Sequence, residues 1–291
     1  MTARPEQPAG HAASEHQTSE HQAREREARA LATDADHALA AELAARSAAL
    51  LRELRAAGPD DPDELRKQGD RRSHVFLVSE LAARRPADAV LSEEGRDDPR
   101  RLGARRVWIV DPLDGTREFG EPGRPDWAVH VALVIDGFPV VGAVALPALN
   151  QVWSTAAVPA APNRGPASDP PRLAVSRTRP GWSAGLVERA LDADLVPLGS
   201  AGYKALAVVR GEADIYAHSG GQYEWDSAAP VAVALACGLH ASRLDGNELA
   251  YNNPDPYLPD LLIAHPDCAP AALRAVADGD PTAVTSPARE T

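Results

Sequence analysis

Cysteine, lysine and long apolar segments are all scarce in this sequence of 291 residues. The two cysteines, Cys237 and Cys268, are too few for a disulfide framework and form no CxxC pair, so we expect both to be small core residues. No apolar run reaches the roughly 18 residues needed to cross a bilayer. The polar N-terminus also lacks the apolar core of a signal peptide. These absences predict a soluble, cytoplasmic protein without a membrane segment.

Basic residues are outnumbered by acidic ones, 30 to 42, which gives a formal net charge of −12. Such a surface argues against binding to a nucleic-acid polymer, which requires a basic face. If the substrate is itself an anion, cations must reconcile it with this acidic protein. Only Lys67 and Lys204 are lysines, so a lysine at a particular position stands out more than an arginine does.

What is present is an ordinary globular composition, with 44% hydrophobic and 25% charged residues. At about 150 residues per domain, the length suggests one large domain or two coupled ones. We expect a disordered polar tail over 1–27, an N-terminal α+β sub-domain with a metal site over 28–160, a C-terminal α/β sub-domain over 172–280, and a frayed tail over 281–291. The Pro/Ala/Gly/Asn-rich segment 157–171 marks the boundary between the sub-domains.

Periodicity predicts helices and strands in both halves. In the first half we expect helices over 28–57 and 70–83, and strands over 89–92, 106–110, 128–135, 140–146 and 151–156, with Asp136-Gly137 as the turn of a hairpin. In the second half we expect strands over 172–176, 213–217 and 261–265, and helices over 185–191, 200–210, 226–237 and 269–277. This alternation predicts an α/β sandwich in which two sub-domains share one site.

The most informative segment is a strand that ends in two acids. Asp111 follows the apolar residues 107–110, Pro112 ends the strand, and Asp114 comes three residues after Asp111 across a tight turn. Gly115 permits close approach of a ligand, and a short helix is expected from Thr116. Paired carboxylates hold hard cations such as Mg²⁺, and a helix N-terminus receives phosphate. The pattern alone is also compatible with a simple strand end and turn.

Three further acids are candidates for the same site. Glu93 follows a short apolar strand, Asp226 lies at the start of an Ala/Val-rich helix, and Asp70 lies at the start of the predicted helix 70–83. Asp226 and Asp70 also have an ordinary interpretation as helix N-caps.

The motifs DPLDGT at 111–116, WDSAAP at 225–230 and SEEG at 92–95 resemble the inositol monophosphatase superfamily of Mg²⁺-dependent, lithium-sensitive phosphatases, over about residues 30–280. Several segments also resemble its 3′(2′),5′-bisphosphate nucleotidase branch, usually called CysQ: AVSR at 174–177, GSAGYK at 199–204, RGEADIY at 210–216, Glu224 before Trp225, and LAYN at 249–252. The resemblance implies an α/β fold, a layered αβαβα sandwich of the inositol monophosphatase and fructose-1,6-bisphosphatase type.

The resemblance also implies two or three Mg²⁺ ions and direct hydrolysis by water. The implied metal ligands are Glu93, Asp111, the Leu113 carbonyl, Asp114 and Asp226, with Asp70 at a third ion. At Asp70 the chain departs from the family, because the usual Thr a few residues earlier is missing.

The implied catalytic residues are Thr116 and Glu93, which would orient and deprotonate the water. The implied substrate contacts are Gly115, Thr116, Arg177, Ser200, Lys204, Glu224 and Asp226, with Arg177 and Lys204 for a second phosphate. Arg177 and Lys204 are also compatible with ordinary surface positions, and Arg179 stands where nucleotidases often have His. We expect Tyr251 to pack rather than stack on a base, and His218, His240 and His265 to be structural.

These features predict an enzyme that hydrolyses the 3′-phosphate of 3′-phosphoadenosine 5′-phosphate to AMP, serving sulfur assimilation or nucleotide recycling. An inositol 1-phosphate or sugar phosphatase on the same fold is the alternative, and the metal site does not separate the two. An inactive metal- or nucleotide-binding regulator is a third hypothesis, but it would have no need of Thr116. A homodimer is compatible with the resemblance. Whether the sulfated precursor is also a substrate stays open.

Overall fold

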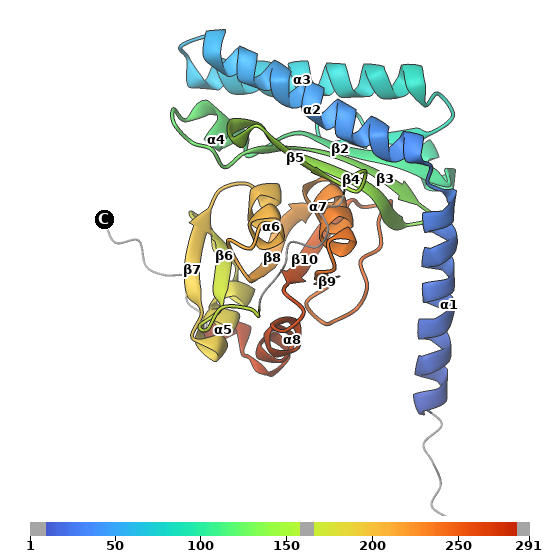
Figure 1. Cartoon of the computed structure of the whole chain (residues 1–291), viewed down its shortest axis with the longest axis vertical. Coiled ribbons are helices and arrows are strands. Elements are labelled where there is room, and N and C mark those ends of the chain that lie inside the picture. Colours follow the sequence, from blue (N-terminus) through green and yellow to red (C-terminus); the bar gives the residue numbers. More distant parts are fainter. Residues whose placement is uncertain (1–9, 158–165, 284–291) are drawn as a thin grey trace, which may run out of the picture.

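The computed structural model describes residues 10–157 and 166–283 (Figure 1). Three predicted segments therefore lie wholly or partly outside the described residues: 1–9 of the N-terminal tail, 158–165 of the boundary segment, and 284–291 of the C-terminal tail.

Two five-stranded mixed sheets form the framework. The first sheet has the order β1(Ala89–Ser92), β2(Arg106–Asp114), β3(Ala128–Ile135), β4(Phe138–Leu146), β5(Gln151–Ser154). The second has the order β7(Asp194–Leu198), β6(Arg172–Ser176), β8(Ile215–Tyr223), β10(Tyr257–Ala264), β9(His240–Ser242). In the first sheet, β1 pairs with β2 in parallel and all other pairs are antiparallel. In the second, β6 is parallel to both β7 and β8, and the remaining pairs are antiparallel.

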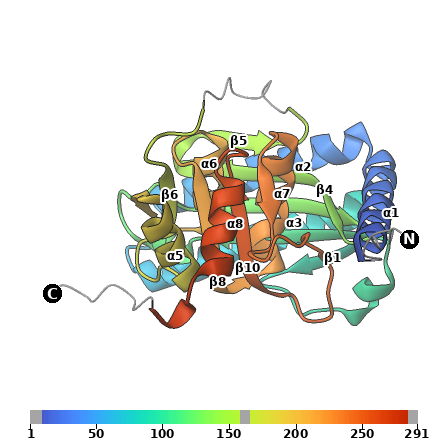
Figure 2. The same cartoon turned by 90° about the horizontal axis from the view of Figure 1, so that it is seen from below.

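Helices form three layers around these sheets (Figures 1 and 2). The first layer, over the outer face of the first sheet, contains α2(Asp34–Ala57), α3(Pro62–Arg84) and the short α4(Thr116–Gly120). The middle layer, between the sheets, contains α6(Ala201–Val209) and α7(Glu224–Ala236), and the last contains α5(Trp182–Leu191) and α8(Ala269–Asp278). Short 3₁₀ helices are η1(Pro99–Gly103), η2(Pro147–Leu149) and η3(Pro281–Ala283). The predicted αβαβα sandwich is confirmed.

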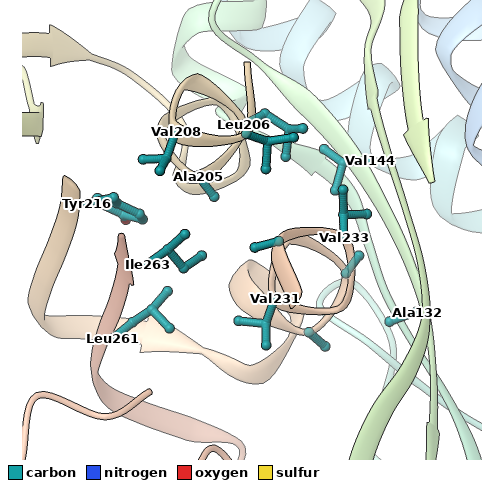
Figure 3. Packing of buried hydrophobic residues seen from close by; sticks show 14 of the residues in the cluster. Ala132, Val144, Ala205, Leu206, Val208, Tyr216, Val231, Val233, Leu261 and Ile263 are labelled. Carbon is teal, nitrogen blue, oxygen red and sulfur yellow. The ribbon is translucent and has the colours of Figure 1, made fainter. Parts of the chain in front are cut away.

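The core explains why the strands of the first sheet are apolar throughout. Successive side chains of β2 point to opposite faces, so Val107 and Ile109 join the cluster around α6 and α7, whereas Trp108 and Val110 join the cluster under α2 and α3. Figure 3 shows the inner cluster, in which Val231 and Val233 of α7 lie near residues of both sheets. This packing fixes α7, and with it Asp226, between the two sheets.

The N-terminal region differs from the prediction. Residues 10–27, expected to be a disordered tail, lie in α1(Gly10–Leu31), which extends away from the sandwich in Figure 1. Ala, Glu, Gln and Arg all favour helix, and the His21 ring packs 4.8 Å from the Phe138 ring. The predicted helix 28–57 is interrupted at Thr33, which caps the start of α2. The Asp36 N–H donates to Thr33 Oγ1, and Asp36 Oδ2 accepts in turn from the Thr33 N–H.

Helix α3 begins earlier than predicted. Asp61 caps it by accepting from the Asp63 N–H at 2.9 Å, and Pro62 occupies its first position. Asp70 therefore lies inside the helix, and its interpretation as an N-cap is wrong. The early turns are mostly polar, with Leu65 as their one large apolar side chain, so the apolar pattern of the sequence begins too late to reveal them. The short strands β7 and β9 were not predicted either, and the other elements match with shifted bounds.

Within residues 10–157 and 166–283, no helix combines the length and apolar content that a membrane crossing requires.

The contact between β4 and α7 gives a test of the packing. A Cβ added at Gly142 would lie 2.6 Å from the Ala229 carbonyl oxygen and 2.7 Å from the Ala232 Cβ. We therefore expect Gly142→Ala to reduce the free energy of unfolding by about 1–3 kcal/mol, as overpacking does. Denaturant titration measures the change. Gly103→Ala, where a Cβ meets nothing within 4 Å, is the control. Equal stability of the two variants would contradict the close packing.

Candidate active site

Strand β2 delivers two acids to one turn, as the sequence predicts. Its pairing with β3 shifts between Asp111 and Asp114, and the Leu113 N–H donates to Asp111 Oδ1 at 3.0 Å. Gly115 follows with φ 84°, a left-handed conformation that favours glycine, and α4 begins at Thr116. Asp111 and Asp114 are 1% and 6% exposed, so the turn holds both carboxyl groups inside the protein.

Asp226 reaches the same place from the other half of the chain. One ligand oxygen each from Asp111, Asp114 and Asp226 all lie within 4.8 Å of one another. Asp226 lies in the first turn of α7, and its Oδ2 accepts from the Tyr223 N–H at 2.7 Å. The arrangement of these three carboxylates is one that can hold a metal ion.

Glu93 and Asp70 adjoin this group. Burial raises the pKa of Glu93 to about 7, and the nearby carboxylate of Asp114 adds to the shift. Burial also raises the pKa of Asp70 to about 7, with a contribution from Glu94. Thr116 links Asp70 to the turn, because its Oγ1 lies 3.3 Å from Asp70 Oδ1 and donates to the Leu113 carbonyl at 3.0 Å.

The buried acids are not equivalent electrostatically. Burial and the charges of neighbouring acids raise the pKa values of Asp111 and Asp226, the latter to about 7. Burial also acts to raise the pKa of Asp114, but contacts with His130 and the charge of Lys204 outweigh it, and the pKa is lowered. Asp114 is therefore the acid that stays ionised most readily. A cation at the cluster would favour the ionised form of the others.

Asp114 is also held by the start of α6. It accepts from the Ala201 N–H at 3.1 Å and from the Gly202 N–H at 2.6 Å, and His130 Nε2 lies 3.2 Å from its Oδ2. The other ring nitrogen of His130 lies 3.0 Å from the Trp225 carbonyl oxygen. These contacts join β2 to both helices of the middle layer.

A pocket of about 530 Å³ opens beside these acids. Among the predicted site residues, Asp114, Gly115, Thr116, Ser200, Lys204 and Asp226 line it. Residues that the sequence analysis did not assign to the substrate also line it: Arg117, Glu118, Ser176, Thr178, Arg179, Gly199, Ala201, His218, Gly220, Gly221 and Gln222. His218, expected to be purely structural, is thus a wall of the pocket, and burial lowers its pKa to about 4. A larger groove of about 600 Å³ between α5 and α8 contains none of the clustered acids.

Arg177 does not take the position expected for it, whereas Arg179 does reach the pocket. Arg177 does not line the pocket; its Nη2 donates to Asp126 Oδ2 at 2.8 Å and to the Pro197 carbonyl at 3.2 Å. Asp126 is buried and also accepts from the Gly199 N–H at 2.6 Å. The Arg177 guanidinium thus supports the loop before α6, and Arg179 is the arginine of this segment that lines the pocket.

Lys204 lines the pocket but is largely occupied. It is 5% exposed, and its ammonium donates to the carbonyl oxygens of Ser200, at 2.8 Å, and Gly199. Burial lowers its pKa.

Glu224 and Tyr251 are buried away from the pocket lining. Glu224 is 0% exposed and accepts hydrogen bonds from Asn252 and Asn253, so the substrate contact expected for it is not what the structure shows. Tyr251 is 3% exposed, belongs to the inner core cluster and has its hydroxyl 3.2 Å from Ser227 Oγ. The expectation that Tyr251 packs is confirmed.

Comparisons with known proteins agree with this geometry. The family model described as the inositol monophosphatase family matches residues 24–277. A protein of Mycobacterium leprae named 3′-phosphoadenosine 5′-phosphate phosphatase is 51% identical over 249 residues, which cover 82% of this chain and 92% of that protein. The 3′(2′),5′-bisphosphate nucleotidase CysQ of Escherichia coli is 30% identical over 198 residues, 64% of this chain and 79% of that protein.

A solved structure of CysQ from Bacteroides thetaiotaomicron, titled a bacterial member of the inositol monophosphatase family, has a TM-score of 0.68 at 25% identity and covers 81% of this chain and 98% of its own. The family match spans both sheets and every carboxylate of the acidic cluster. This chain belongs to the inositol monophosphatase family.

Proposed function

We propose that the protein is a Mg²⁺-dependent phosphatase that hydrolyses the 3′-phosphate of 3′-phosphoadenosine 5′-phosphate, giving AMP and phosphate. The proposal rests on one observation above all: three carboxylates from both halves of the chain, two of them buried, converge beside a pocket that Thr116 also lines. The name of the relative that is 51% identical supports the choice of substrate. A role in sulfur assimilation, a cytoplasmic location, a homodimer and sensitivity to lithium stay predictions.

The donor set fits Mg²⁺. All the groups are hard oxygen donors, and their burial and mutual repulsion leave negative charge that a cation would compensate. We propose Glu93, Asp111, the Leu113 carbonyl, Asp114 and Asp226 as the ligands of two ions, and Asp70 for a third. When bound, Mg²⁺ would supply the positive charge that an anionic phosphoryl group requires in an acidic pocket.

Thr116 and Glu93 are the proposed catalytic residues. The single hydroxyl hydrogen of Thr116 is directed to the Leu113 carbonyl or to Asp70, so the oxygen keeps lone pairs with which to accept a hydrogen bond from water. Glu93, with a pKa raised to about 7, suits proton transfer near neutral pH. In this scheme water attacks phosphorus and gives a proton to Glu93, while the bond between phosphorus and the ribose 3′ oxygen breaks. The leaving oxygen keeps the electron pair of that bond and takes a proton from solvent to become the 3′ hydroxyl of AMP, and Glu93 then returns its proton to solvent.

The pocket also offers groups for the rest of the substrate. We propose that the N–H groups of Gly115 and Thr116, with Ser200, contact the reacting phosphate. For the second phosphate, Arg179 and Lys204 are the better candidates, since both line the pocket whereas Arg177 is held by Asp126. Within the described residues no hydrogen bond or ion pair engages the Arg179 guanidinium, so that cation is available to an anion.

Substrate preference tests the proposal directly. A phosphate-release assay with Mg²⁺ should favour 3′-phosphoadenosine 5′-phosphate over inositol 1-phosphate by about 10- to 150-fold in kcat/KM, which corresponds to one charge-assisted contact of roughly 1.5–3 kcal/mol. EDTA should abolish release from both. A preference for inositol 1-phosphate would select the alternative phosphatase, and activity that survives EDTA would contradict the metal assignment.

Thr116→Ala tests the proposed role of the hydroxyl. Because the variant loses the hydroxyl that orients water but keeps every proposed metal ligand, kcat should fall by about 10²- to 10⁴-fold while the Mg²⁺ concentration for half-activation changes little. Steady-state rates over a Mg²⁺ series give both quantities. Thr116→Ser keeps the hydroxyl and should retain most of the rate. Equal losses in kcat and in Mg²⁺ activation by Thr116→Ala would make Thr116 a support of the metal site instead.

Asp111→Asn tests the electrostatic cost of the acidic cluster. Because burial and neighbouring carboxylates raise the pKa of Asp111, its ionised form destabilises the metal-free fold above neutral pH. At pH 8 in EDTA the variant should therefore melt higher than wild type, by about 2–4 °C for each kcal/mol of relief. Mg²⁺, which should raise the Tm of wild type, should raise that of the variant much less.

Asp260→Asn is the control for this comparison. Asp260 pairs with Arg243 at 2.7 Å on β10, outside the cluster. Its loss should lower the Tm and leave the increase caused by Mg²⁺ intact. A lower Tm of metal-free Asp111→Asn would show that its carboxylate stabilises the fold, contrary to the argument.

A further inference from the structure

Glu224 combines full burial with an unusually complete set of hydrogen-bond donors. Its Oε2 accepts from the Asn252 N–H at 2.7 Å, and its Oε1 accepts from the Asn253 N–H and the Asn253 side-chain amide, both at 2.8 Å. The main-chain N–H of Glu224 donates to the Pro256 carbonyl at 2.8 Å. Both the backbone and the side chain of Glu224 are therefore bound to the single segment 252–256.

The same segment is held from the other half of the chain by Arg101. This arginine is 1% exposed, and its Nη1 donates to Asn252 Oδ1 at 2.8 Å and to the Asn253 carbonyl at 2.9 Å. In return, the Asn252 side-chain amide donates to the Arg101 carbonyl at 3.0 Å. Asp97 binds the rest of the guanidinium, with contacts of 2.6 and 3.0 Å. The buried cation thus has a carboxylate and two further hydrogen bonds.

These contacts connect elements that carry the clustered acids. Arg101 lies in η1, between β1, after which Glu93 follows, and β2, which ends in Asp111 and Asp114. Glu224 opens α7, two residues before Asp226. The contacts that run from η1 through segment 252–256 to α7 therefore connect the part of the chain that carries Glu93, Asp111 and Asp114 with the helix that carries Asp226.

We propose that Glu224 is a positioning residue, which together with Arg101, Asn252 and Asn253 forms a clamp that holds Asp226 at the metal site, with Glu224 and Arg101 as its buried members. The clamp rests on the proposed function, because its purpose is to place a metal ligand. It also gives a role to the LAYN motif at 249–252 and to the acid before Trp225, neither of which the pocket uses.

The chemistry of the clamp requires a carboxylate. Three N–H donors converge on Glu224, and an ionised carboxylate offers only acceptors. A glutamine there would turn its own N–H₂ toward a donor and leave buried groups unpaired, which in a fully satisfied network is costly. The shape would be nearly unchanged, so the loss would act through the position of α7 rather than through a cavity.

Glu224→Gln is the test, with Mg²⁺ affinity measured by titration calorimetry in the absence of substrate. Residues that orient metal ligands typically contribute about 10- to 100-fold to metal affinity, and we expect a weakening of that size. At saturating Mg²⁺ the KM for 3′-phosphoadenosine 5′-phosphate should be close to that of wild type. Unchanged Mg²⁺ affinity would overturn the clamp, and a raised KM at saturating Mg²⁺ would indicate a substrate contact instead.

Asp214→Asn is the matched control. Asp214 is also buried and accepts from the Arg172 N–H at 2.8 Å and from its guanidinium at 3.0 Å, but it holds no segment that carries a clustered acid. It should lower the Tm without changing Mg²⁺ affinity. An equal loss of Mg²⁺ affinity in Asp214→Asn would show that general destabilisation, not the clamp, is being measured.

Asn252→Gly provides a second, milder variant. Asn252 has φ 64°, which glycine adopts freely, so the N–H to Glu224 should remain while both contacts with Arg101 are lost. Mg²⁺ affinity should fall in the same direction by less, and no fall would contradict the Arg101 arm of the clamp. Wild-type protein that binds no Mg²⁺ would contradict the proposed function, whereas binding that Glu224→Gln leaves intact would contradict the clamp alone.

Discussion

The mutual repulsion of buried carboxylates is the constraint on which the rest of this structure depends. Asp111, Asp114 and Asp226 bring oxygens within 4.8 Å of one another, with Asp111 and Asp114 buried and Asp226 partly exposed. Groups of like charge stay together in such surroundings only if the backbone holds them and a cation compensates them. The fold meets the first condition, because β2 ends in a fixed turn, α6 donates two N–H groups to Asp114, and α7 is packed between both sheets.

The part of this site that can be predicted from sequence is the part encoded by neighbouring residues. The apolar strand before Asp111, the proline at 112 and the glycine at 115 define a turn without reference to any other segment, although the strand shifts its pairing at Pro112 and runs on to Asp114 instead of ending there as predicted. The alternation of helices and strands likewise predicts an α/β sandwich, whereas its αβαβα layering is implied by the family resemblance. The link between this turn and Asp226 comes from the family resemblance rather than from local physics, because the two lie in different halves of the chain.

The partners of long side chains are a different matter, because they depend on which segments fold side by side. Arg177 and Arg179 belong to one short segment, yet the buried Asp126 engages Arg177, and Arg179 lines the pocket. Nothing in the local pattern distinguishes them. Likewise the early turns of α3 are mostly polar, so periodicity places Asp70 at a helix start when a cap at Asp61 has already begun the helix. Capping and ion pairing are therefore where the sequence-based expectations fail.

Glu224 and Asp226 show how one helix both anchors itself to a neighbouring segment and supplies an acid to the cluster. Residues two apart on an α-helix point about 200° away from each other, since each residue turns the helix by roughly 100°. The rotation that aims Asp226 at the acidic cluster therefore aims Glu224 away from it, into the donors of segment 252–256. A carboxylate at each of the two positions thus has a different consequence. The Glu224 carboxylate accepts hydrogen bonds from N–H groups and fixes the helix, whereas the Asp226 carboxylate remains near other negative charges and needs a cation. The order of acids along α7 follows from that geometry.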